Sequence, residues 1–164
     1  MKKTAIAFYI FLTLSIAVNV FIIVEGGIGG EGSANQSFSI TQIFIDFVKN
    51  INPNSPIVTD PETTHYVIRK LVGHFGLFGV SGILTTITYC LINEGLDKRK
   101  VEIIISSIFT GLLVAFISEL MQLFAPGRVF AIADVGIDFS GYFLFGGITF
   151  LIFYLVHNKK EKNK

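Results

Sequence analysis

Four long runs of apolar residues, separated by more polar segments, dominate the sequence. The runs extend from Ala5 to Val24, Leu71 to Ile92, Ile103 to Phe124 and Val135 to Val156. Each is long enough to cross the hydrocarbon core of a bilayer as a helix, which takes about 20 residues. Backbone polar groups in lipid need partners within the chain, so helices are expected rather than irregular segments. The pattern predicts an all-α integral membrane protein, an antiparallel bundle of four transmembrane helices.

The first apolar run has two possible readings, a cleaved signal peptide or a retained anchor helix. It follows Lys2 and Lys3, as either type of segment would. A signal peptide has an apolar core of about 7–15 residues and a cleavage site with small residues. This run is longer and ends at Val24-Glu25 without such a site. We therefore interpret residues 1–24 as an N-terminal anchor helix.

The segment from residue 25 to residue 66 is the one long polar stretch of the sequence. Its glycine-rich start, Gly26 to Gly32, is typical of a flexible exit from a helix. Apolar residues then recur at near-helical spacing, which favours an amphipathic helix on the membrane surface or over the bundle. These residues are Phe38, Ile40, Ile43, Phe44 and Phe47. We expect an external loop that contains such a helix.

Composition and charge narrow the class further. The chain is 51% hydrophobic and 15% charged, whereas soluble domains carry about 25% charged residues. A net charge of +1 without a basic face argues against nucleic-acid binding. Cys90 is the single cysteine and lies inside an apolar run, where a small buried hydrophobe is the expected role. The expected environment is therefore a lipid bilayer, with no nucleic-acid partner.

The distribution of lysine and arginine predicts the orientation in the cell membrane. If both termini are cytoplasmic, the basic residues of the N-terminus, the 93–102 connection and the C-terminal tail all lie inside. Only Lys49, Arg69, Lys70 and Arg128 then lie outside. Cytoplasmic loops normally carry the excess of basic residues. We expect a multi-pass protein with both termini in the cytoplasm.

The polar residues of the apolar runs gather at one membrane level, the predicted outer one. They are Arg69, Lys70 and His74 at the start of the second run, Glu119 and Gln122 near the end of the third, Arg128 and Asp134 in the outer link, and Asp138 one turn into the fourth. Charges within a membrane are costly and are commonly paired or functional. Interfacial charges also extend to headgroups without further function, an alternative that suits Lys70 and Asp134 taken singly. We expect these residues to form one ligand-binding site.

Helical spacing indicates which of these residues share a face. Lys70 and His74 are four residues apart, as are Asp134 and Asp138. A seam of small residues in the third run ends at Glu119, which would let another helix approach closely. Glycines at every third position from Gly73 to Gly82 supply small positions in the second run. The three histidines are far apart and show no metal-ligand spacing, so no metal or cofactor is predicted.

The combined motif resembles that of a known family. Glu119-x-x-Gln122-x-x-x-Pro126-Gly127-Arg128, followed by Asp134 and Gly141, is similar to the signature of the VanZ-like membrane proteins, and Arg69-Lys70-x-x-x-His74-Phe75 resembles their other polar motif. The family usually has asparagine where this chain has Asp138. The resemblance covers about residues 69–147. Together with the apolar runs, it divides the chain into an anchor (1–24), an external loop (25–66), a VanZ-like polar region (67–157) and a basic cytoplasmic tail (158–164).

The resemblance implies a role in the cell envelope, because the named member of the family is associated with teicoplanin resistance in Gram-positive bacteria. The first hypothesis is an envelope protein that binds an anionic lipid-linked wall precursor or teichoic acid through its cationic side chains. The second is a hydrolase or transferase on a polyprenyl-phosphate or teichoic-acid substrate. In that case Glu119 or Asp138 would be the general base, His74 the acid and Arg128 the phosphate clamp. A small transporter ranks last, because the inner halves of the runs carry almost no ionisable residues.

Overall fold

The computed structural model describes residues 2–92 and 96–162, and within these ranges it contains helices and no strands. Met1 of the predicted anchor, Asn163 and Lys164 of the predicted tail, and 93–95 of the charged connection lie outside the described residues. Four helices in the described part are long and apolar enough to cross a membrane: Thr4–Gly26, Pro61–Ile92, Arg99–Phe124 and Ile132–Lys159. The predicted fold class, an all-α protein with four spanning helices, is confirmed.

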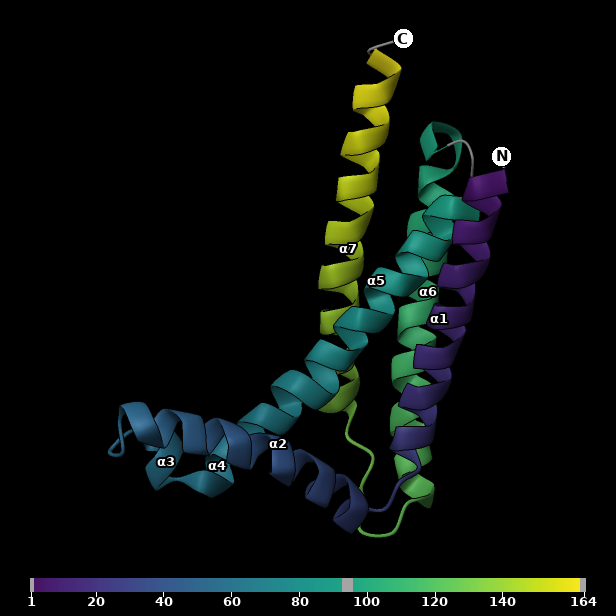
Figure 1. The fold of residues 1–164 in the computed structure, drawn as a ribbon. Coiled ribbons are helices and arrows are strands. Elements are labelled where there is room, and N and C mark those ends of the chain that lie inside the picture. Colours follow the sequence, from purple (N-terminus) through teal and green to yellow (C-terminus); the bar gives the residue numbers. More distant parts are fainter. Residues whose placement is uncertain (1, 93–95, 163–164) are drawn as a thin grey trace.

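The four long helices form an up-and-down bundle (Figure 1). Helix α1 (Lys2–Gly26) descends, α5 (Leu77–Ile92) rises, α6 (Leu96–Met121) descends, and α7 (Ile132–Lys162) rises again. Both ends of the chain therefore lie at the same end of the bundle. Helix α5 packs against each of the other three, and its packing against α7 is the most extensive in the bundle. Because these two helices rise together, residues at a constant separation in sequence face each other.

A layer of helices that run crosswise to the bundle covers the end opposite the termini (Figure 1). It contains α2 (Gly30–Ile51), α3 (Pro56–Thr59) and α4 (Pro61–Ile68). The last two helices begin with proline after a capping residue: Ser55 accepts from the Ile57 amide, and Asp60 accepts from the Thr63 amide. Caps of this kind satisfy amides that have no partner within the helix.

The glycine-rich segment after α1 is shorter and better anchored than the predicted flexible exit. Only Gly27, Ile28 and Gly29 separate α1 from α2. The Gly30 amide donates to the carbonyl of Pro126 at 2.8 Å, and a Cβ on Gly30 would lie 2.7 Å from the Gly127 carbonyl oxygen. The absence of a side chain thus permits a close backbone approach between two connections. Here glycine serves packing rather than flexibility.

The core of the bundle is built around Tyr142 of α7, whose side chain is 1% exposed. Gly82 of α5 and Gly111 of α6 lie directly against it, and a Cβ at either position would overlap Tyr142. Small residues let helix backbones approach closely in membranes, where water drives no apolar association between helices. The two glycines thereby bring α5, α6 and α7 together just above the predicted polar site.

The predicted glycine spacing in the second apolar run is only partly used for packing. A Cβ at Gly79 would overlap the Phe145 ring and one at Gly82 would overlap Tyr142, whereas a Cβ at Gly73 would meet nothing within 4 Å. Gly73 lies in a π-helical stretch, η1 (Arg69–Gly76), which continues α4 into α5. The wider turn changes which side chains face α7. At this end of the run, residues three positions apart therefore do not share a face as they would in an α-helix.

Candidate functional site: a buried polar cluster and an adjoining pocket

Most of the predicted site residues meet where η1, the end of α6 and the start of α7 converge, next to the crosswise layer. We call this group the polar cluster; it contains Lys70, His74, Glu119, Gln122, Arg128, Asp134 and Asp138. The predicted Arg69 does not contact the cluster through a hydrogen bond or ion pair, but lines the pocket beside it. Residues far apart in sequence thus come together at one end of the bundle.

Two pairs of side chains connect η1 to α7. The Lys70 ammonium is paired with the Asp134 carboxylate, and the His74 Nδ1 lies 2.9 Å from Oδ1 of Asp138. Both pairs join residues 64 positions apart in the sequence. This shared register follows from the parallel course of the two helices. Gly141, one turn further along α7, lets the Phe75 backbone approach and so supports both pairs.

A chain of hydrogen bonds fixes the side chains contributed by α6 and the link after it. Gln122 donates through Nε2 to Oε1 of Glu119 and accepts from Nε of Arg128 at 3.0 Å. The amide of Ala131 donates to Oε2 of Glu119 at 3.4 Å. The Gln122 side chain is therefore held with a known orientation, because it must accept from a guanidinium and donate to a carboxylate.

Glu119 and His74 join the two halves of the cluster. The His74 Nδ1 lies 4.0 Å from Oε1 of Glu119 and 2.9 Å from Oδ1 of Asp138, so both carboxylates approach the same ring nitrogen. Glu119 and Asp138 are both 0% exposed. Buried ionisable groups are stable only when they are paired, protonated or bound to a cation. The arrangement can move a proton, orient a ligand or hold a metal ion.

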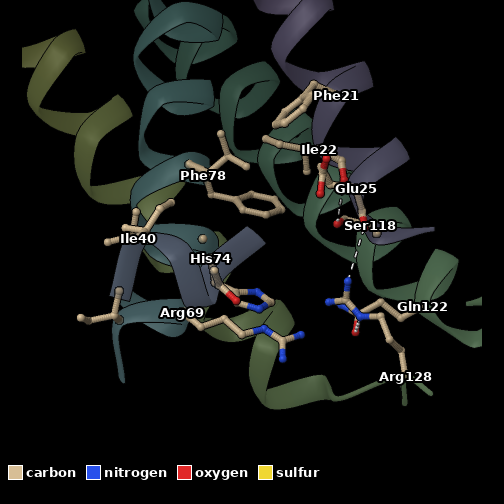
Figure 2. A pocket seen from close by; sticks show the side chains of 16 residues that line it. Phe21, Ile22, Glu25, Ile40, Arg69, His74, Phe78, Ser118, Gln122 and Arg128 are labelled. Carbon is tan, nitrogen blue, oxygen red and sulfur yellow. Dashed lines mark hydrogen bonds between the residues drawn. The ribbon is translucent and has the colours of Figure 1, made fainter. Parts of the chain in front are cut away.

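A pocket of about 200 Å³ opens beside the cluster (Figure 2). Arg69 and His74 line one side of it, and Gln122 and Arg128 line the other. The part toward the middle of the bundle is apolar, because Ile22 and Phe78 lie deeper along α1 and α5 than the charged residues do. Further apolar lining comes from Phe21, Ile40, Ile68, Val72 and Leu77. The pocket therefore has a cationic mouth and an apolar interior.

The charges that line the pocket favour an anion. The lining contains two guanidinium groups, those of Arg69 and Arg128, and one carboxylate, that of Glu25. Burial lowers the pKa of Arg128 from its usual value and the nearby positive charge of Arg69 acts in the same direction, whereas the carboxylates of Glu119, Asp134 and Glu25 act in the opposite direction. Guanidinium groups remain charged in proteins nonetheless. A bound anion between the two groups would relieve this unfavourable interaction.

Sequence reasoning missed the contribution of the first helix to this pocket. Glu25 lines it, and its carbonyl accepts from Nη1 of Arg128 at 3.4 Å. Ser118 of α6 also lines it, and donates to the Ile22 carbonyl at 3.4 Å. Glu25 ends the first apolar run, at the same membrane level as the predicted cluster, and this position was the available signal. The sequence contains no such signal for Ser118, since a serine in an apolar run is commonly a packing residue.

The sequence profile of one family, VanZ/LLP1, matches residues 8–155, which is nearly the whole chain. The chain belongs to the VanZ/LLP1 family. The match extends well beyond the 69–147 region whose motifs resemble VanZ-like proteins, and it includes α1 and α2. No curated protein and no solved structure matches the chain.

The residues whose spacing resembles the VanZ-like motif lie together in the structure. Glu119, Gln122 and Arg128 form one hydrogen-bonded chain, and the Pro126-Gly127 pair turns the link that brings Arg128 back to the cluster. Gly127 has a φ of +73°, which other residues rarely adopt. The motif therefore encodes a turn and the orientation of three side chains, rather than a set of separate polar residues.

Proposed function

We propose that this VanZ/LLP1 protein is a cell-envelope component that binds an anionic lipid-linked wall precursor or wall polymer at the outer surface of the cell membrane. Binding there would contribute to resistance to glycopeptides such as teicoplanin, or to wall homeostasis. The observation that carries the proposal is the pocket with two guanidinium groups at its mouth and apolar side chains behind them. Such a pocket suits a phosphate attached to a hydrocarbon chain, since guanidinium groups bind phosphate with paired hydrogen bonds.

The orientation of the bundle supports an outer location. Both termini lie at the end opposite the polar cluster (Figure 1), and the basic residues are concentrated toward the ends of the chain and in the 93–102 connection. Under the positive-inside rule that end is cytoplasmic. The pocket then opens toward the wall, where glycopeptides act.

Replacement of Arg128 by alanine tests the binding role. Arg128→Ala removes one guanidinium from the pocket, and a charge-assisted hydrogen bond contributes about 1.5–3 kcal/mol. We expect affinity for a polyprenyl phosphate to fall by about 10- to 100-fold, as measured by native mass spectrometry of the purified protein. Affinity for the neutral polyprenol should not change. Lys49→Ala is the matched control, because Lys49 is an exposed cation on α2, outside the pocket.

The same variants test the cellular role. In a strain that depends on this protein for teicoplanin resistance, R128A should lower resistance at an unchanged protein level, and K49A should not. Resistance that persists in R128A would contradict the proposal. Lipids extracted from the purified wild type should include an isoprenoid phosphate that is depleted from R128A.

A second candidate function is enzymatic, and one observation favours it. Two fully buried carboxylates, those of Asp138 and Glu119, lie within 4.0 Å of Nδ1 of His74, beside a pocket that would hold a phosphate. Glu119 or Asp138 would serve as general base, His74 as general acid and Arg128 as phosphate clamp. The wild type would then release a product from a polyprenyl-phosphate or teichoic-acid substrate, and E119Q would not. Product release by E119Q at the wild-type rate would rule out Glu119 as the base.

A further inference from the structure

The arrangement of three side chains in the polar cluster points to a further site. One ligand atom from each of His74, Glu119 and Asp134 lies within 4.8 Å of the other two. We propose that these residues bind one divalent transition-metal ion, of which Zn²⁺ is the representative. The inference goes beyond the proposed function and does not depend on it: His74 also lines the lipid pocket, but Glu119 and Asp134 do not, and metal binding can be measured without lipid.

The three residues come from three separate elements, which explains why their spacing in the sequence shows no metal motif. His74 belongs to η1, Glu119 to α6 and Asp134 to α7. An imidazole nitrogen with two carboxylate oxygens is a donor set that suits zinc and related first-row metals. Ligand atoms around such an ion stand about 3.5 Å apart, given bonds of about 2.0–2.2 Å. Small side-chain rotations would bring the present positions to that separation.

The charge of the cluster is the independent reason to expect a cation. The cluster contains three carboxylates, those of Glu119, Asp134 and Asp138, and two permanent cations, Lys70 and Arg128. Lys70 is paired with Asp134, and Nε of Arg128 donates to Gln122. Asp138 is 0% exposed, and its Oδ2 has no hydrogen-bond partner in the described structure. Burial of an uncompensated carboxylate is strongly unfavourable. A divalent ion beside the His74 ring would compensate for the charge of Glu119 and Asp138.

Asp138 has a supporting role in this site. Its Oδ1 accepts a hydrogen bond from Nδ1 of His74 at 2.9 Å, which leaves Nε2 as the nitrogen that would bind the metal. A carboxylate bonded in this way to a metal-binding histidine orients the ring and increases its basicity. Asparagine at this position could still accept a hydrogen bond but would lack the charge. Replacement of such a partner typically weakens metal binding by about 10- to 100-fold.

Replacement of Lys70 tests the proposal because it should increase the affinity for the metal rather than decrease it. Its ammonium group occupies the Asp134 carboxylate that the metal would use. The two cations therefore compete, and Lys70→Gln should bind the metal more tightly than the wild type. An ion pair that serves only stability would give no such increase.

The experiment measures Zn²⁺ bound to the purified full chain. After treatment with a chelator and its removal, the protein is titrated with Zn²⁺ in detergent without added lipid, and bound metal is counted by elemental mass spectrometry. We expect one ion per chain in the wild type and in the control variant E62Q, because Glu62 is an exposed carboxylate that is not among the three proposed ligands. D138N should bind about 10- to 100-fold more weakly, and H74A, E119Q and D134N more weakly still.

The outcomes separate this proposal from the lipid-binding one. No stoichiometric Zn²⁺ on the wild type would overturn the metal site, even if polyprenyl phosphate still binds. Equal affinity in wild type, E119Q and D134N would overturn it as well, because the ion would then sit elsewhere. Since H74A could fail to fold, each variant is also checked for a monodisperse elution profile, and the wild-type result decides the proposal alone.

Discussion

Gly141 is the position where a small change should disturb both the packing and the polar cluster. An ideal Cβ built on Gly141 would overlap the backbone of Phe75, and the Phe75 Cα would lie 3.0 Å from it. The Phe75 carbonyl oxygen would lie nearer still. Carbon and oxygen atoms in contact normally stand about 3.3–3.6 Å apart, so Gly141→Ala must move α7 away from η1 by about 1 Å or more. The partner atoms are backbone, which cannot rotate away.

The cost of this displacement can be worked out in two parts. Overpacking of a close contact typically destabilises by about 1–3 kcal/mol. The same movement would lengthen the 2.9 Å contact between His74 and Asp138 beyond hydrogen-bonding distance. For a chain of this size each kcal/mol corresponds to about 2–4 °C in Tm. We expect the G141A protein in detergent to melt several degrees below the wild type.

Gly147 provides the matched control on the same helix. A Cβ on Gly147 would meet nothing within 4 Å, so G147A adds a methyl group without a clash. Alanine is a better helix former than glycine by up to about 1 kcal/mol, and G147A should melt at or slightly above the wild-type temperature. A fluorescence or light-scattering melt of the three proteins is sufficient. Equal Tm values for G141A and G147A would refute the close approach of α7 and η1.

Two further predictions concern interactions within the bundle. Lys70→Met should lower the Tm, because it leaves the largely buried Asp134 without its ion-pair partner. Adding Asp134→Asn should restore part of the lost Tm, whereas additive losses in the double variant would contradict a direct pair. Ser15 and Thr85 share a hydrogen bond of 2.8 Å between α1 and α5, and Ser15→Ala should cost about 0.6 kcal/mol, the typical value between membrane helices. A thermal melt of S15A that falls by many degrees would contradict this modest contribution.

The spanning helices could be predicted from the sequence because their signal is the length of an apolar run, which does not depend on the partners of the helix. The boundaries were less accurate. The second run, expected from Leu71, is continuous with α4 and forms a helix from Pro61 to Ile92. Its π-helical stretch, which packs against α7, has no simple sequence signal.

The composition of the polar cluster was predictable, whereas its pairing was not. Residues at one membrane level must lie near one another once the spans are placed, so His74, Glu119 and Asp138 could be grouped from the sequence. Which of them touch depends on the register of α5 and α7, and this register is set by the close contacts at Gly82 and Gly141. Glu25 was missed for a related reason, because nothing in the sequence indicates how α1 is rotated.

The central claim is that the polar pocket opens to the outer face of the cell membrane. Single cysteines introduced into a Cys90→Ala background test it directly with a maleimide that cannot cross membranes. Val129 adjoins Arg128 and is 80% exposed, while Glu102 is exposed near the opposite end of α6. In intact cells V129C should be labelled, and E102C should be labelled only after permeabilisation. The reverse pattern would place the pocket in the cytoplasm and contradict the account.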